Sequence, residues 1–287
     1  MVALQEKPTA LRIAKLSEHV GAEATGVDLT RPLDEETRRR LNRALVDNIT
    51  LVIRSQSFTP QQFLAAASLF GEPMEDHAKK YALPGVPLVR AVSSRHRDKD
   101  DKWVKVGIQW HTDHTNHVYP PKYTTLYAVE LPPAGGDTSI VNMRAGYESL
   151  PEALKRRIEG MKTVNVLVGS AAKTAGLYAV ENSEQASRTP ILQPLVRTNP
   201  DTGSKALYFH PKKTETITGM SPADSQELLD ELMEHAIRPE FIYAHKWRLG
   251  DMLIWDNRSA LHKAAFDYDP DQHRLLYRAM IKGELPQ

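Results

Sequence analysis

The sequence predicts a mostly β protein with flanking helices around a double-stranded β-helix, the jelly roll. Many short runs of β-favouring residues follow residue 86, and Pro, Gly or Asp separates many of them. Only two helical segments interrupt these runs, so the alternation of strand and helix that marks a parallel sheet is missing. The chain also lacks GxGxxG, P-loop and GxSxG sequences, which leaves nucleotide-binding and serine-hydrolase folds without their usual motifs.

The first elements are two helices and a strand. We expect the first helix to be introduced by residues 30–32, with acidic residues at its positive N-terminal end and apolar residues at helical spacing up to Ile49. The run ITLVIR then predicts a buried strand. In the second helix we expect Thr59 as the N-cap, Pro60 at the first helical position and an end at Gly71.

The rest of the chain predicts nine strand-like runs and two helical segments. The expected strands are VPLVRAV (86–92), YTTLYAVEL (123–131), TSIVNM (138–143), KTVNVLVG (162–169), PILQPLVRT (190–198), KALYFH (205–210), FIYAHKW (241–247), DMLIWD (251–256) and LLYRAMI (275–281). The expected helical segments are 143–160 and 221–238. Without a repeat or a Gly/Ser linker, we expect a single domain over residues 1–287.

Composition excludes several classes of protein. Lys and Arg number 37 against 36 Asp and Glu, so no overall basic field predicts nucleic-acid binding. The absence of cysteine excludes disulfides, thiolate metal sites and a cysteine nucleophile. No apolar run approaches the length of a membrane span, and the first residues lack the apolar core of a secretory signal. We therefore expect a cytoplasmic protein without a membrane partner.

The stretch VGIQWHTDHTNHVYPP, residues 106–121, concentrates imidazole and carboxylate groups. On a strand, His111 and Asp113 would project from one face and could reach one metal ion together. The best third ligand is His262, which closely follows the predicted strand 251–256. Two imidazoles and a carboxylate form the facial triad of non-haem Fe(II) oxygenases. His-x-Asp is also common by chance, and a polar loop is the alternative; His114 and His117 are the expected bystanders.

When the C-terminal run HRLLYRAMIKGE is taken as a strand, Arg274 and Arg278 share one face with the apolar Leu276 and Met280. Burying two guanidinium groups is costly unless anions accompany them. A solvent-facing edge strand is the simpler explanation. Beside a metal triad, the pair instead predicts two anion-binding groups, since Arg suits bidentate carboxylate recognition.

The chain resembles the taurine dioxygenase family, which includes 2,4-dichlorophenoxyacetate dioxygenases and alkylsulfatases. The similarity runs over nearly the whole chain and is carried by GAEATGVDLTRPL, WHTDHT, ELPPAGGDTSIVNM, GDMLIWDNRSALHKA and HRLLYRAMI. The resemblance implies an Fe(II)- and 2-oxoglutarate-dependent dioxygenase. Such an enzyme uses O₂ to hydroxylate a substrate and releases succinate and CO₂.

Matched residue by residue, the resemblance implies that His111, Asp113 and His262 bind iron. Thr138 and Arg274 would then bind 2-oxoglutarate. The implied substrate contacts are Arg278, His77 and Tyr81, of which the last two match with a spacing that differs by one residue. A substrate-binding Asn of the taurine enzyme falls here on Gly107, so taurine itself is not indicated.

The expected substrate is a small organic anion: a sulfonate, a sulfate ester or an aryloxyalkanoate. Related enzymes form dimers or tetramers, so we expect a homo-oligomer. Residues 77–106, rich in charge and containing Gly85, are expected to include a lid over the substrate pocket. Two alternatives are a metal-dependent hydrolase on the same ligands and an inactive metal-bearing jelly-roll binding protein. Only the dioxygenase forms succinate from 2-oxoglutarate.

Overall fold

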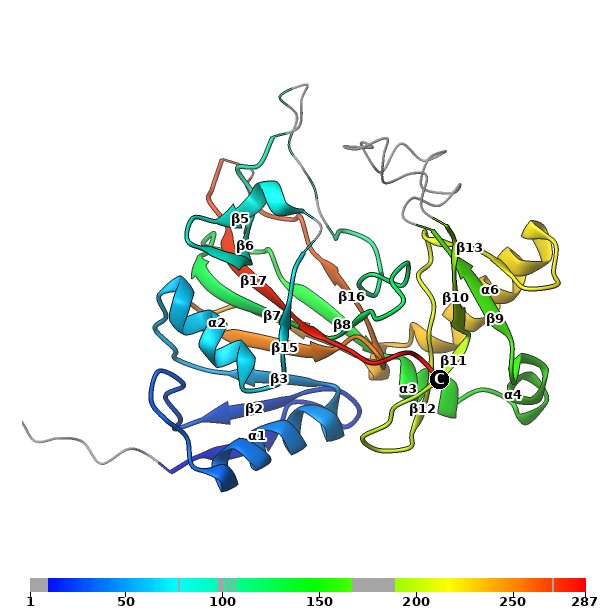
Figure 1. Ribbon diagram of the computed structural model, residues 1–287, viewed down its shortest axis with the longest axis horizontal. Helices are drawn as coiled ribbons and strands as arrows, with labels where there is room; N and C mark the ends of the chain where they lie inside the picture. Colours follow the sequence, from blue (N-terminus) through cyan, green and yellow to red (C-terminus); the bar gives the residue numbers. More distant parts are fainter. Residues whose placement is uncertain are drawn as a thin grey trace, which may run out of the picture.

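The computed structural model describes residues 10–76, 78–97, 101, 103, 105, 107–166, 189–269 and 271–287. Figure 1 shows a large sheet at the centre, helices on its outer face, and a smaller β region beside it that carries further helices. His77, a predicted substrate contact, lies outside the described ranges. Some residues of the predicted lid within 98–106, and residues 167–169 of the predicted strand 162–169, also lie outside them.

The main sheet has nine strands, and most of its pairs are antiparallel. Its order is β1-β2-β3-β15-β7-β17-β6-β5, with β4 paired to β17. Its strands are β1 (Arg12–Lys15), β2 (Ala22–Thr25), β3 (Thr50–Ile53), β4 (Pro73–Met74), β5 (Ala82–Leu83), β6 (Val86–Ser93), β7 (Pro121–Glu130), β15 (Met252–Asp256) and β17 (Leu275–Lys282).

A second sheet, β14-β8-β16, packs against the inner face of the main sheet. Its strands are β14 (Ile242–His245), β8 (Thr138–Asn142) and β16 (Ala260–Ala264). Side chains from both sheets form the layer between them, including Leu126, Trp255 and Leu276 from the main sheet and Ile140 and Ala260 from the second. This pair of sheets confirms the predicted jelly-roll core.

Strand alternation assigns one set of side chains to the interior and the next to the outer helices. In β17, Leu276 faces the inner layer, whereas Ala279 and Ile281 pack with the helix-covered outer core. Arg278 therefore points to the interior with Leu276, and it is buried. The prediction that this face of the last strand carries buried arginines is confirmed, and the edge-strand alternative is wrong.

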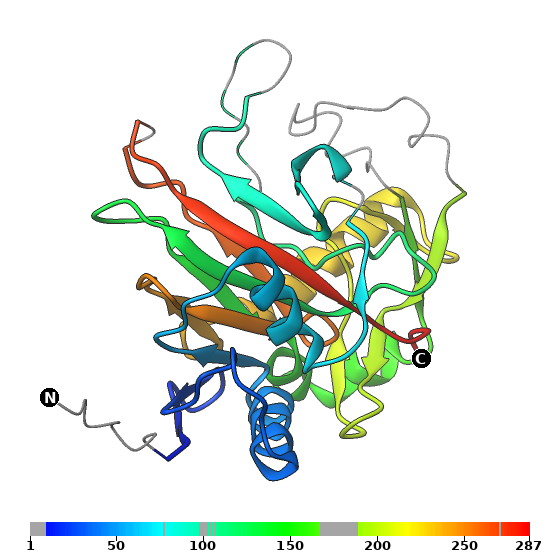
Figure 2. The same cartoon turned by 60° about the vertical axis from the view of Figure 1, so that its left-hand side comes forward.

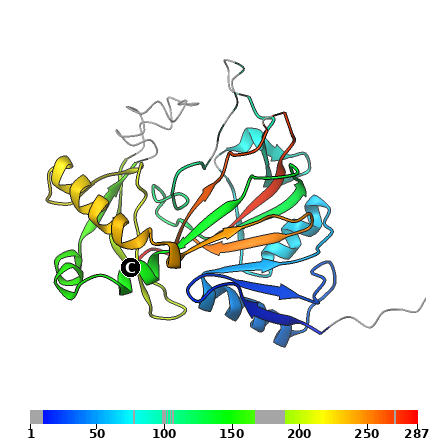
Figure 3. The ribbon, with the colours of Figure 1, turned by 180° about the vertical axis from the view of Figure 1, so that it is seen from behind.

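Helices cover the outer faces. The helices α1 (Glu35–Asn48) and α2 (Pro60–Ser68) pack on the main sheet, where Figure 2 shows α2 lying across its outer face. The helices α3 (Met143–Glu148), α4 (Glu152–Ile158) and α6 (Pro222–Ala236) enclose a separate core beside the second sheet (Figure 3). Among the described residues, no helix combines the length and the apolar character needed to cross a bilayer.

Capping residues define the N-terminal ends of α1 and α2. The Asp34 side chain caps α1 by accepting a hydrogen bond from the backbone N–H of Thr37. The helix therefore begins at Glu35, three residues after the segment 30–32 that was predicted to precede it. Thr59 caps α2, and Pro60 occupies its first position, as predicted. That helix ends at Ser68, before the predicted end at Gly71.

Two predicted segments are each divided in the structure. Segment 143–160 is two helices, because Pro151 has extended backbone and serves as the N-cap of α4. Segment 190–198 is two strands, β10 (Ile191–Pro194) and β11 (Val196–Thr198), which join different small sheets. These sheets are β10-β9-β13 and β11-β12, with β9 (Lys162–Asn165), β12 (Lys205–Leu207) and β13 (Thr214–Ile217). Short 3₁₀ turns, η1 (Lys79–Tyr81) and η2 (Pro239–Phe241), precede β5 and β14.

Part of the predicted lid belongs to the main sheet. Strands β5 and β6 form a hairpin, and β6 pairs with β17 from Ser93 to Arg90. Residues 82–93 are therefore a wall of the interior rather than a separate cover. A lid function for the remainder of 77–106 stays a prediction.

The close approach of α3 to α6 gives a stability prediction. A Cβ on Gly146 would lie 2.8 Å from the Cβ of Ala236, a distance that forces the helices apart. We expect Gly146→Val to lower the free energy of unfolding by about 1–3 kcal/mol through overpacking. Denaturant unfolding measures this. Glu148→Val, at an exposed position of the same helix, is the control and should change stability by less than about 0.5 kcal/mol. Equal losses in both variants would contradict the helix contact.

Candidate metal centre and anion pocket

Three potential metal ligands converge between the sheets. One ligand atom from each of His111, Asp113 and His262 can be chosen so that all lie within 4.8 Å of one another. Among the described residues these form the one His/Cys/Asp/Glu group that is clustered closely enough for a metal ion. The structure thus brings together the three residues that the sequence predicted as ligands.

Backbone pairing places the two histidines side by side. His111 and His262 form an isolated antiparallel bridge, in which each N–H donates to the other's carbonyl at 3.0 and 2.8 Å. The predicted strand through 111–113 is wrong, because pairing stops at His111 and His114 has a left-handed φ of 52°. His262 lies in the strand β16. Asp113, in contrast, reaches the site from a loop that turns at His114.

The two imidazoles have free nitrogen atoms. The Nδ1–H of His111 donates to the carbonyl of Gln109 at 2.7 Å, so its Nε2 carries a lone pair. The buried Nδ1 of His262 has no hydrogen-bond partner in the described chain. Burial lowers the pKa of both rings, most strongly that of His262, and thus favours the neutral form that binds metals. This donor set fits a divalent transition metal.

Asp113 is oriented by a chain of hydrogen bonds. Its Oδ2 accepts from the Thr124 hydroxyl at 2.6 Å, and that hydroxyl accepts from the Asn257 amide at 2.9 Å. Asn257 in turn accepts from the indole N–H of Trp255 at 3.0 Å. The WDN sequence therefore has a structural role that the sequence prediction did not assign: it holds the Thr124 hydroxyl toward Asp113.

Arg278 also binds Asp113. Its Nη2 lies 2.7 Å from Oδ2 of Asp113, and its Nη1 contacts Oδ2 of Asp76. Burial by itself would raise the pKa of Asp113, but the charge of Arg278 and smaller contributions from the neighbouring histidines together hold the pKa well below its usual value. The predicted substrate clamp is therefore already shared between two carboxylates of this chain, and its contact with substrate stays a prediction.

Asp76 lies between two arginines. Arg90 of β6 is the cross-strand partner of Arg278 in β17, and its Nε lies 3.2 Å from Oδ2 of Asp76. Two neighbouring guanidinium groups repel each other, so the carboxylate between them is needed for both to stay buried. The sequence prediction missed Asp76, although it is adjacent to the predicted contact His77.

The second predicted anion site contains Arg274 and Thr138. The Nε of Arg274 donates to the carbonyl of Gly136 at 3.0 Å, whereas its buried Nη2 has no hydrogen-bond partner in the described chain. The Thr138 hydroxyl accepts from the indole of Trp247 at 3.1 Å, and the Arg274 guanidinium lies 6.0 Å from the centroid of that indole. Both predicted residues thus lie in one corner, with one guanidinium nitrogen available for an anion.

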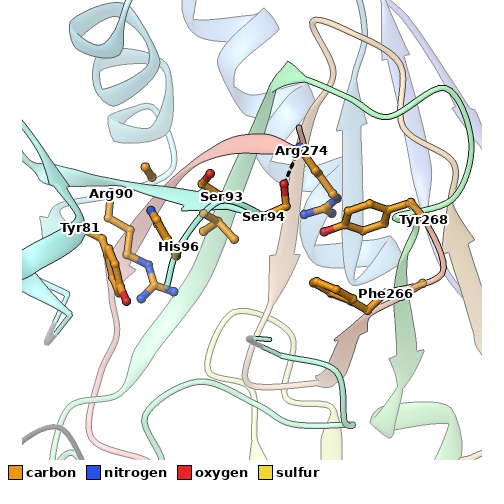
Figure 4. Close-up of a pocket in the computed structure, with 12 residues that line it drawn as sticks. Tyr81, Arg90, Ser93, Ser94, His96, Phe266, Tyr268 and Arg274 are labelled. Carbon is orange, nitrogen blue, oxygen red and sulfur yellow. Dashed lines mark hydrogen bonds between the residues drawn. The ribbon is translucent and has the colours of Figure 1, made fainter. Parts of the chain in front are cut away.

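A cavity adjoins this corner. Figure 4 shows Tyr81 and Arg90 at one end of it, and Phe266, Tyr268 and Arg274 at the other. Ala264, two residues beyond His262, also lines the cavity, which places it next to the candidate metal centre. Tyr81 stacks on His96 with ring centroids 4.0 Å apart. Tyr81 therefore lines the cavity, and its contact with substrate stays a prediction, whereas His77 is outside the described residues.

Gly107 lies against the first histidine. It has a left-handed φ of 72°, and a Cβ there would lie 3.2 Å from Cε1 of His111. Its carbonyl accepts from the N–H of Ala264 at 2.7 Å, which holds the backbone close to β16. A larger residue at this position would crowd the imidazole.

Two further residues near the ligands were missed by the sequence prediction. The ring of His210 is 5.9 Å from that of His111, and its Nδ1 accepts from the backbone N–H of Lys212 at 3.0 Å. Lys213 is buried and interacts electrostatically with Asp113 and Arg278. Both lie in the segment HPKK, whose sequence carries no recognised metal or catalytic spacing, so only the fold could identify them.

Comparison with known proteins agrees with this geometry. The family described as "Taurine catabolism dioxygenase TauD, TfdA family" matches residues 12–280. A (S)-phenoxypropionate/alpha-ketoglutarate dioxygenase from Sphingobium herbicidovorans is 34% identical, over 96% of this chain and 96% of that protein. An alkylsulfatase from Acinetobacter baylyi is 32% identical, over 99% of this chain and 89% of that protein.

A solved structure is similar over almost the full length. The crystal structure of AAD-2 with Mn(II) and N-oxalylglycine aligns with a TM-score of 0.82 and 30% identity, over 97% of this chain and 99% of that one. With the sequence match over residues 12–280, this agreement leads to one conclusion: the chain belongs to the TauD/TfdA family of dioxygenases.

Proposed function

We propose that this protein is an Fe(II)- and 2-oxoglutarate-dependent dioxygenase that hydroxylates a small anionic organic substrate. The observation that carries the proposal is the convergence of His111, Asp113 and His262 beside a buried arginine with an unpaired nitrogen. Three protein ligands on one side of a metal ion leave positions for cosubstrate and O₂. The relatives named for phenoxypropionate and alkyl sulfate support the same reaction class.

In the mechanism, His111, Asp113 and His262 would hold Fe(II). Bound Fe(II) and 2-oxoglutarate together supply O₂ activation and the oxidative decarboxylation to succinate and CO₂ that drives C–H hydroxylation. Arg274 would bind the distal carboxylate of 2-oxoglutarate, and Thr138 would donate a hydrogen bond to it. Arg278 and Thr124 keep Asp113 ionised and oriented. The apolar layer around Trp255 excludes water from one side of the site.

The substrate class follows from charge and from relatives. Buried cations exceed buried carboxylates around Asp113, which favours an anionic ligand. The named relatives support a carboxylate or a sulfate ester, and the family description supports a sulfonate. We propose Arg278, His77 and Tyr81 as substrate contacts, and a cytoplasmic homo-oligomer as the form of the protein. A zinc hydrolase on the same ligands would produce no succinate, which makes succinate release the discriminating assay.

The first prediction concerns the metal ligands. Anaerobic protein with Fe(II) and 2-oxoglutarate should show a weak visible charge-transfer band, and His262→Ala should lose this band and substrate-dependent succinate formation. Losing one of three ligands leaves too few donors to retain the ion. His235→Ala, which changes a histidine of α6, is the control. Retention of both the band and turnover in His262→Ala would show that the third ligand is another residue.

The second prediction concerns the orientation of Asp113. Thr124→Val removes the hydroxyl that bonds to Oδ2 while keeping the shape of the side chain. We expect a loss of roughly 10- to 100-fold in Mn(II) affinity, measured by isothermal titration, as is typical when a group supporting a metal ligand is lost. The control is Thr125→Val, whose buried hydroxyl instead bonds to the carbonyl of Ala279. Unchanged Mn(II) affinity in Thr124→Val would remove this hydroxyl from the metal centre.

The third prediction concerns the cosubstrate. Losing a buried charge-assisted contact costs about 2–5 kcal/mol. Arg274→Ala should therefore raise the 2-oxoglutarate concentration needed for half-maximal succinate formation by roughly one to three orders of magnitude. Arg248→Ala, at an exposed position before β15, controls for loss of a positive charge. A similar 2-oxoglutarate requirement in wild type and Arg274→Ala would exclude Arg274 from the cosubstrate site.

A further inference from the structure

The site contains a third buried cation besides Arg90 and Arg278. Lys213 has an exposed fraction of only 8%. Its ammonium makes no hydrogen bond or ion pair with any described residue, whereas both arginines contact Asp76. Isolated buried charges are costly and are normally matched by a partner of opposite sign. Among the described residues, Lys213 therefore differs from Arg90 and Arg278 in having no carboxylate at ion-pair distance.

The backbone around Lys213 fixes its place. Its N–H donates to the carbonyl of His210 at 3.1 Å, and its own carbonyl accepts from the N–H of Val166 at 2.9 Å. It immediately precedes β13 of the small sheet β10-β9-β13. Figure 1 shows β13 and β6 on the two sides of β16, the strand that carries His262. Lys213 thus comes from the turn before a strand of the small sheet, whereas Arg90 comes from a strand of the main sheet.

Lys213 is close to this centre through His210, whose carbonyl accepts from its N–H and whose ring lies 5.9 Å from that of His111. Burial lowers the pKa of Lys213 to about 8, and the groups that act on it next are Asp113, Arg278 and Asp76, all at the site. Lys213 does not line the cavity that contains Arg274. Its charge is therefore placed for a ligand beside the metal centre rather than for the distal carboxylate of the cosubstrate.

We propose that Lys213 binds the acid group of the primary substrate and makes the enzyme selective for anions. This inference rests on the proposed dioxygenase function and adds a residue to its substrate site. The matching chemistry is a single negative charge on oxygen, as in a carboxylate, a sulfate ester or a sulfonate. A lysine suits all three, because its ammonium acts as a point charge without the planar geometry of a guanidinium.

Binding without turnover tests the proposal. Protein loaded with Mn(II) and N-oxalylglycine is titrated calorimetrically with 2-phenoxypropionate, hexyl sulfate and hexanesulfonate. Each is compared with its uncharged analogue: 2-phenoxypropionamide, hexyl sulfamate and hexanesulfonamide. The three pairs distinguish the acid types, and the ratio of affinities within a pair isolates the charge.

Wild type should bind at least one acid about 10- to 100-fold more tightly than its uncharged analogue. In Lys213→Gln and Lys213→Met this ratio should fall close to one, whereas Lys213→Arg should keep most of it. Both neutral variants are expected to fold, since they remove a buried charge that has no partner in the described chain. Lys212→Gln, next to it in the same turn, should keep the wild-type ratio.

An undiminished ratio in both neutral variants would overturn the proposal and leave the selection of anions to another cation. Equal affinity of wild type for acid and analogue in all three pairs would also overturn it. Failure of the wild type to bind Mn(II) and N-oxalylglycine is a different result, because it would refute the dioxygenase function on which the proposal rests.

Discussion

The buried contact between Asp113 and Arg278 is the interaction on which the site depends. It joins the loop after His111 to the strand β17, across the interior between the two sheets. A buried ion pair recovers its desolvation cost only when further hydrogen bonds satisfy both groups. Thr124 provides such a bond to Asp113, and Asp76 provides a second carboxylate for Arg278. The carboxylate of Asp113 is therefore kept ionised and in place before any metal binds.

The two sheets make different contributions. The second sheet supplies His262 and Thr138 and, by pairing with β16, positions His111. The main sheet supplies most of the positive charge, from β6 and from β17 and the residue before it. Side chains alternate along a strand. When one set of β17 side chains points to the interior with Arg278, the other set, with Ala279 and Ile281, therefore packs against the outer helices. The helix α2 packs on the outer face of β17 and β6 and thus supports the strands that carry the arginines.

The candidate anion-binding residues lie in different parts of the site. Arg274 lies in a corner with Thr138 and Trp247, at one end of the cavity in Figure 4. The other end contains Arg90 and the stacked pair of Tyr81 and His96, which form a flat surface suited to an apolar or aromatic group. Lys213, in the turn before β13, adds positive charge outside this cavity. A ligand with a compact acid group and a small apolar body fits this distribution.

The sequence by itself determined the parts of the protein that depend on local patterns. Strand-like runs located β3, β6, β7, β8, β14, β15 and β17, but they missed β16 of the second sheet and the short strands β1, β2, β4 and β5. Thr59 and Pro60 located the start of α2, and WHTD, the histidine after the run 251–256 and the last strand identified the three candidate ligands and the buried arginines. Only the tertiary structure decided how these parts meet. Asp76 and Lys213 acquire their significance from groups distant in the chain, and Pro151 and His114 interrupt segments that their neighbours would continue. The physical reason is that burial and charge pairing are properties of the packed interior, whereas periodicity and capping act between residues close in sequence.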